Sequence, residues 1–136
     1  MAIKITYSEL LDGINPSLKE ISKLSFPIST PVSHHIDIAE NLNKIERVAK
    51  SFWDTRNKFL EELCDKDDKG KPVIENIEGN PSYKFSNENS IIWANRLEEL
   101  RNEEIEIELK KINKKYFEGV EGLRPEILKG ILVILK

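Results

Sequence analysis

Two adjacent histidines, His34 and His35, are the first residues whose type could bind a metal. Zinc ligands on a helix lie three or four residues apart, whereas neighbouring residues point about 100° apart. The residues four positions further on, Ile38 and Ala39, cannot coordinate a metal. We therefore expect no metal site here, and we expect both histidines to lie on the surface near the start of a helix.

The segment from Asp65 to Gly70 resembles the start of a calcium-binding loop. It has carboxylates at its first and third positions and a glycine at its sixth, as an EF-hand loop does. The fifth position is Lys69, which would bring a positive charge among the ligands, and the twelfth is Asn76 in place of a bidentate glutamate. The segment is therefore predicted to be a turn that terminates a helix, without a metal.

Few residues suggest catalysis. Cys64 is the single cysteine, no histidine lies near it in the sequence, and no serine lies in a Gly-x-Ser-x-Gly motif. The six glycines are scattered and form no phosphate-binding loop. The acidic residues of segment 103–108 alternate with apolar ones, as on a solvated sheet face. We expect a protein that is not an enzyme, with no catalytic residues and no cofactor.

Arg56 interrupts the longest apolar stripe in the chain. Because a buried charge is costly unless it is paired, two interpretations remain open. The stem of Arg56 crosses the contact seam with its head in water, or the guanidinium pairs with a carboxylate of a returning helix or of another subunit. The aromatic residues beside it make the stripe too wide for one seam. The candidate residues for an interface with another chain are Phe52, Trp53, Arg56, Phe59 and Leu60.

The stripe predicts one long helix over about residues 33–64. Its positions recur at steps of four and three without proline or glycine. At 1.5 Å per residue the helix would be about 45 Å long, more than the diameter of a compact domain of this size. It must protrude or meet a partner. The stripe consists of Ile38, Leu42, Ile45, Ala49, Phe52, Arg56, Phe59 and Leu63.

The segments before this helix predict short elements. Residues 3–5 alternate like a strand, and Thr6 and Glu9 have the spacing of a helix capping box. Gly13 and Pro16 are expected to break the helix that follows into two short pieces. Residues 24–28 alternate again, and their proline predicts a strand at a sheet edge.

The segments after the long helix predict a β-hairpin over about residues 71–85 and a returning helix over about 87–103, with Ile92 among its inward residues. Residues 105–109 alternate strictly, but their composition also suits a helix; we favour a strand that pairs with an N-terminal one. A last helix is expected from Pro125. The predicted fold is a single α+β domain over residues 1–136: a long antiparallel helical hairpin with a small β-sheet and short flanking helices.

Composition excludes several classes of protein. The chain has 136 residues, with 21 basic and 24 acidic side chains interspersed and a net charge of −3. No basic stripe of the kind that binds nucleic acid is present, so nucleic-acid binding is not expected. The most apolar run, residues 131–135, is far shorter than the ~20 residues of a membrane span. With one cysteine and no signal-peptide pattern, the expected location is the cytoplasm.

A series of short motifs in a fixed order runs through nearly the whole chain. It resembles families of short, mostly uncharacterised proteins encoded in tailed-phage and prophage genomes. The resemblance implies a phage origin, hence a bacterial host cytoplasm, and it implies no activity. The motifs are Leu-x-x-Ile-x-Lys-Leu-x-Phe-Pro-Ile (Leu18 to Ile28), the helix with Ile45, Glu46, Phe52, Arg56 and Leu60, the Asp-Lys-Asp-Asp-Lys-Gly-Lys-Pro turn, Tyr83 and Phe85, Leu97-Glu98-Glu99-Leu100, Glu104-Ile105-Glu106-Ile107 and Leu123-x-Pro125.

The function expected from these features is non-catalytic protein–protein interaction or assembly, most simply by a homo-oligomer. The alternative is a phage inhibitor of host defence that binds a small ligand such as a nucleotide signal. That alternative needs aromatic and basic residues that converge in a pocket between subunits. The basic residues that could supply its charge are Arg96, Arg101, Lys110, Lys111, Lys114 and Lys115.

Overall fold

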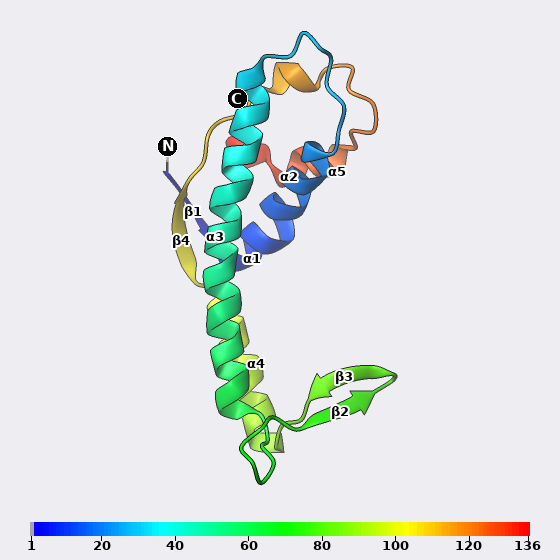
Figure 1. Cartoon of the computed structure of the whole chain (residues 1–136). Coiled ribbons are helices and arrows are strands. Elements are labelled where there is room, and N and C mark those ends of the chain that lie inside the picture. Colours follow the sequence, from blue (N-terminus) through cyan, green and yellow to red (C-terminus); the bar gives the residue numbers. More distant parts are fainter. Residues whose placement is uncertain (1) are drawn as a thin grey trace. The chain divides into compact units, whose positions relative to one another are not determined.

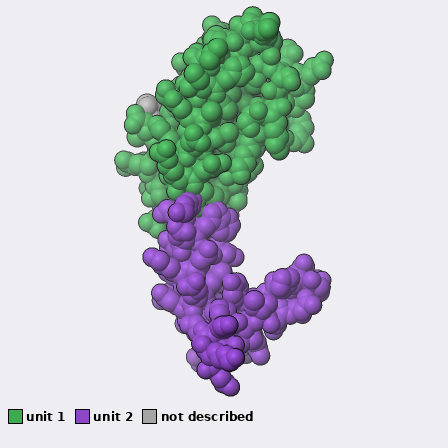
Figure 2. Space-filling model, viewed as in Figure 1, with its two compact units in different colours: residues 1–49, 103–136 green, residues 50–102 purple. Residues whose placement is uncertain are grey.

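The computed structural model describes residues 2–136 and confirms an α+β fold, with two small antiparallel sheets among the helices (Figure 1). The described residues fall into two compact units: those up to residue 49 together with 103–136 form unit 1, and residues 50–102 form unit 2 (Figure 2). The elements are β1 (Ala2–Thr6), α1 (Tyr7–Glu9), α2 (Asn15–Ser22), α3 (Val32–Leu63), β2 (Ile74–Ile77), β3 (Asn80–Tyr83), α4 (Asn87–Arg101), β4 (Glu104–Glu108) and α5 (Pro125–Gly130), with one π-helical segment (Leu10–Ile14) and two 3-10 segments (Lys114–Phe117 and Leu132–Ile134).

The sheet of unit 1 pairs the N-terminal strand with a strand about a hundred residues further along the chain. β1 and β4 are antiparallel, with Ile3 opposite Ile107 and Ile5 opposite Ile105. The alternation of isoleucine and glutamate therefore forms a strand, as the sequence predicts, and its partner is the N-terminal strand. Isoleucine is a good strand former, and its cross-strand pairs stabilise the two-stranded sheet.

A continuous helical segment follows β1. The capping box is confirmed: the Thr6 hydroxyl accepts a hydrogen bond from the Glu9 N–H at 3.1 Å. The predicted break at Gly13 and Pro16 is wrong, because a π-helical turn joins α1 to α2. In that turn the Asn15 N–H donates to the Leu10 carbonyl. A proline has no N–H to donate and crowds the carbonyl of the preceding turn, and the wider turn lets the helix continue past it.

The large hydrophobic core lies in unit 1. Residues 24–28 pack beside it through Leu24 and Phe26, but they form no strand, so the predicted edge strand is wrong. Each sheet of the described residues has two strands, and none of them takes this segment as a partner. The core consists of Ile3, Ile5, Leu10, Ile14, Leu18, Ile21, Ile38, Ile45, Ile107, Leu109, Ile112, Phe117, Ile127, Ile131 and Ile134.

The long helix predicted from the apolar stripe is confirmed as α3, which has 32 residues. Its first half contributes to unit 1, and its second half begins unit 2. In the first half, His34, Ile38, Asn41 and Ile45 are buried at steps of four, three and four. Asn41 thus occupies a position of the buried face at which the predicted apolar stripe had placed its neighbour Leu42.

In unit 2, the predicted hairpin and the helix after it are confirmed. β2 and β3 are antiparallel, and the two residues between them, Glu78 and Gly79, have φ angles of 51° and 84°. Two left-handed residues in succession are typical of a tight hairpin turn. α4 begins at the Ser86 cap and has 15 residues, fewer than half the number in α3. Ile92, predicted to point inward, is 40% exposed.

No helix within residues 2–136 is both long enough and apolar enough to cross a membrane.

Candidate interaction surface

Unit 2 has a small interior and a large exposed apolar surface. Its buried apolar residues are few, and none of them belongs to the large hydrophobic core. Scattered exposed apolar residues are normal on a protein surface, but a concentration of them on a small unit points to binding. The buried set is Phe52, Leu60, Leu63, Cys64 and Leu100, and the exposed set is Trp53, Ile74, Ile77, Tyr83, Ile91 and Ile92.

Arg56 lies between two tryptophan rings. Its guanidinium carbon is 5.4 Å from the ring centroid of Trp53 on α3 and 5.4 Å from that of Trp93 on α4. Phe85 continues the stack, with its ring 5.8 Å from Trp93 and only 15° from parallel. We call these four residues the arginine–tryptophan stack. A cation over an aromatic face is attracted by the negative charge density of the ring.

The stack bears on one of the interpretations of Arg56, the pairing with a carboxylate of the returning helix. Among the described residues its partners are the tryptophan rings and the Asn57 side-chain oxygen, which lies 3.4 Å from Nη1. The carboxylate partner on a returning helix, predicted as one alternative, is therefore wrong. The returning helix does contact Arg56, but through an aromatic ring.

The structure separates the five candidate interface residues. Phe52 and Leu60 are 1% and 6% exposed, so neither offers surface to another chain. The ring of Phe59 lies 5.2 Å from the guanidinium of Arg96, which also pairs with Glu62 at 3.2 Å. Of the five, Trp53 presents the largest apolar surface, at 47% exposed.

The β2–β3 hairpin is the second exposed surface of unit 2, and Figure 1 shows it standing away from α4. Every residue of β2 is exposed. The hairpin is held to the end of α3 through Asp65, whose N–H donates to the Lys84 carbonyl and whose carbonyl accepts from Val73, both at 2.8 Å. An isolated two-stranded hairpin is marginally stable in water, so these backbone bonds matter for its position.

In the turn before the hairpin, the carboxylate of Asp67 accepts hydrogen bonds from backbone N–H groups. The Asp67 Oδ1 atom accepts from the N–H groups of Lys69 and Lys71 at 2.9 and 3.0 Å. Short polar side chains commonly stabilise turns in this way. Among residues 2–136, no group of three or more histidine, cysteine or acidic side chains is placed to hold a metal.

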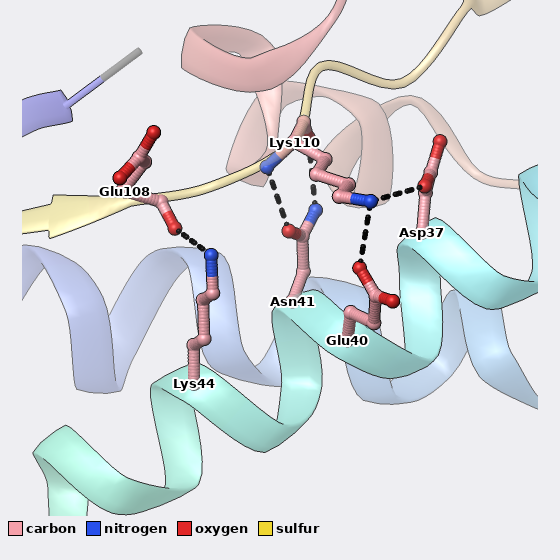
Figure 3. A network of polar contacts seen from close by, with 6 residues as sticks. All are labelled: Asp37, Glu40, Asn41, Lys44, Glu108 and Lys110. Atoms are coloured by element: carbon pink, nitrogen blue, oxygen red, sulfur yellow. Dashed lines mark hydrogen bonds and ion pairs between the residues drawn. The ribbon is translucent and has the colours of Figure 1, made fainter.

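Unit 1 contains a polar network that the sequence analysis missed (Figure 3). Asn41, fully buried on α3, makes two hydrogen bonds with the backbone of Lys110. Lys44 donates to the Glu108 carbonyl at 2.9 Å. The network attaches the segment after β4 to α3. Because it supports backbone, we regard it as structural.

The Lys110 side chain is also part of this network. Its ammonium lies 2.8 Å from Glu40 and 3.5 Å from Asp37. The hydrogen bond from Lys110 lowers the pKa of Glu40 and raises the pKa of Lys110. Lys111 donates to the Val133 carbonyl at 2.6 Å. Two of the basic residues suggested for a ligand site are therefore already engaged in unit 1.

His34 is buried, and its predicted position on the surface is wrong. It is 3% exposed and packs edge-on against Phe26, Tyr116 and Phe117, with ring centroids 4.8, 4.9 and 5.5 Å away. Burial, and then the neighbouring His35, lowers the pKa of His34. Its Nε2 atom has no hydrogen-bond partner among the described residues. His35 is exposed, as predicted.

Comparison with protein-family models, curated proteins and solved structures finds no match to this chain. Its function is therefore inferred from the geometry of the surfaces described above. Of these, the exposed apolar residues of unit 2 are the feature that packing within the chain leaves unexplained.

Proposed function

We propose that this chain is a non-catalytic protein–protein interaction or assembly protein of phage or prophage type, and that unit 2 carries its binding surface. The observation behind this proposal is the exposure of six large apolar residues on a unit that buries only five apolar ones. Water exposure of apolar side chains is unfavourable, and contact with another protein removes it.

Self-association through α3 is the simplest form of this interaction. Trp53 is 47% exposed, and its ring is fixed by contacts with Arg56 and Phe52. A ring that is already held in place loses little conformational entropy on binding. Tryptophan is also enriched among the residues that contribute most to binding energy. A closed homo-oligomer would cover this residue on every copy.

The test is the oligomeric state of a matched pair of variants. Trp53→Glu places a charge at the proposed contact, and we expect it to shift the assembly toward monomer in sedimentation velocity at micromolar concentration. Ser51→Glu adds the same charge at an exposed position two residues away, which points about 160° from Trp53 around the helix axis. It should leave the assembly intact. Equal dissociation by both variants, or a monomeric wild type, would count against self-association.

Binding of a nucleotide signal is the alternative function. It has less support, because Arg96 and Lys110 form ion pairs with Glu62 and Glu40 and Lys111 donates to a backbone carbonyl. A ligand phosphate would have to compete with these partners. Native mass spectrometry of protein purified from cells tests this alternative, since a retained nucleotide would raise the intact mass.

A further inference from the structure

The hydrogen-bond pattern of the β2–β3 hairpin determines which of its backbone groups point outward. The Lys84 N–H donates to the Val73 carbonyl at 2.9 Å, so the backbone groups of Val73 and Lys84 point toward the inside of the hairpin, where Asp65 bonds to the Val73 N–H and the Lys84 carbonyl. In an antiparallel ladder bonded and non-bonded pairs alternate. The pairs Ile74–Tyr83 and Asn76–Pro81 are therefore non-bonded, and their N–H and carbonyl groups point away from the hairpin.

The two outer edges of the hairpin differ in their capacity to accept another strand. On β3, Pro81 occupies an outward position and has no N–H to donate, which weakens pairing at that edge. On β2, the outward positions are Ile74 and Asn76, and the N–H and carbonyl of each point away from β3 in this register. Proteins commonly protect sheet edges with proline. Here the protection is on one edge, and β2 is left open.

The side chains of β2 indicate which residues an added strand would need at the facing positions. Glu75 and Ile77 lie on one face, at the positions where the side chains of an added antiparallel strand come closest. Both are exposed. A basic residue opposite Glu75 would be attracted, and an apolar residue opposite Ile77 would bury it. In an antiparallel partner this is the pattern apolar–x–basic.

A second copy of the chain fits this edge poorly. The register in which Ile74 and Asn76 of two copies exchange four hydrogen bonds places Glu75 opposite Glu75, and like charges directly opposite are destabilising. The register centred on Asn76 avoids that repulsion. It keeps only two of the bonds, since Glu78 at φ 51° turns the chain away from the edge.

We propose that the open edge of β2 binds an extended segment of a different protein, with an apolar residue opposite Ile77 and a basic residue opposite Glu75. The segment adds a third, antiparallel strand, so that backbone bonds to Ile74 and Asn76 supply affinity and the two side-chain positions supply selectivity. This inference rests on the proposed function and names the chemistry of one of its partners.

Two synthetic peptides test it by NMR titration of the full chain. The first is acetyl-Thr-Ile-Thr-Lys-Thr-amide, at up to millimolar concentration, and the second has glutamate in place of lysine. We expect the lysine peptide to shift the amide signals of residues 74–77 and to bind about fivefold more tightly than the glutamate peptide. In Glu75→Lys protein the preference should reverse. The proposal would be overturned if the two peptides bound equally well. It would also be overturned if the peptides shifted only the amide signals of residues outside the hairpin.

A backbone variant gives the second test. Asn76→Pro removes one outward N–H, as Pro81 does on the other edge, without removing a bond within the hairpin. Cross-strand NOEs between Ile74 and Tyr83 report whether the hairpin remains intact. We expect at least a tenfold loss of peptide binding, and unchanged binding by an intact hairpin would contradict the inference. If the variant hairpin unfolds, the charge reversal at Glu75 decides the outcome.

These results are separable from the proposed self-association. Amide shifts of residues 74–77 that depend on protein concentration without peptide would identify a second copy as the occupant and refute the choice of a different protein. A monomeric wild type that still selects the lysine peptide would refute self-association through Trp53 and leave this inference standing.

Discussion

The side-chain amide of Asn41 pairs with the backbone of Lys110, 69 residues further along the chain. Its Nδ2 group donates to the Lys110 carbonyl at 2.9 Å, and its Oδ1 atom accepts from the Lys110 N–H at 2.8 Å. Asn41 is fully buried, and an unsatisfied buried backbone group is costly. One side chain thus provides the two hydrogen bonds that a neighbouring strand would otherwise provide.

Replacing Asn41 by alanine should lower the free energy of unfolding by about 2–4 kcal/mol, because two part-buried hydrogen bonds to the Lys110 backbone are lost. Urea denaturation measures the change. Asn43→Ala is the matched control, since Asn43 is exposed on the same helix and the same substitution raises the helix propensity there by the same amount. It should change stability by no more than about 0.5 kcal/mol. Equal effects of the two substitutions would show that the Asn41 bonds contribute little.

His34 should make the stability of unit 1 depend on pH. Burial lowers its folded-state pKa below the usual 6.5, so the unfolded chain binds the proton more readily than the folded one. Stability is then fully present above about pH 6.5 and is lost as the pH falls below that value. Two neighbouring groups act on His34 through their charge: His35 opposes its protonation and Asp37 favours it.

Comparison of variants isolates this effect from the carboxylates that titrate at lower pH. His34→Leu should show a shallower fall in unfolding free energy between pH 7.5 and 5.5 than the wild type, as measured by urea denaturation. His35→Gln, at the exposed neighbour, should keep the wild-type slope. An unchanged slope in His34→Leu would mean that His34 is as easily protonated in the folded state as in the unfolded one.

Local patterns in the sequence were sufficient for several elements. The spacing of apolar residues predicted α3 within two residues at each end, and the alternation at 105–109 predicted β4. Thr6 and Glu9 predicted the capping box. These features depend on residues within one or two turns of each other, and the backbone conformation follows from them directly.

Features that depend on distant contacts could not be predicted. The partner of Asn41 lies in another part of the chain, and the rings around His34 include Tyr116 and Phe117. Nothing adjacent to Asn41 or His34 in the sequence signals these contacts. The π-helical turn before Pro16 was missed because proline ordinarily ends a helix.

The candidate interface was predictable only in part. The aromatic-rich stretch of α3 contains Trp53, which is 47% exposed, but the stripe alone could not show that Phe52 and Leu60 are buried within the chain. The hairpin edge was missed, because its importance depends on which backbone groups point outward. That property follows from the register of β2 and β3 and not from residue type.

The most direct test of the interaction surface is hydroxyl-radical footprinting of the wild-type chain from nanomolar to high micromolar concentration, with each oxidised peptide resolved by mass spectrometry. Trp53 in unit 2 and Leu132 in unit 1 are 47% and 67% exposed. If copies associate through unit 2, oxidation of Trp53 will fall as concentration rises while oxidation of Leu132 stays constant. Constant oxidation of Trp53 across the series, or protection of Leu132 instead, would contradict the account.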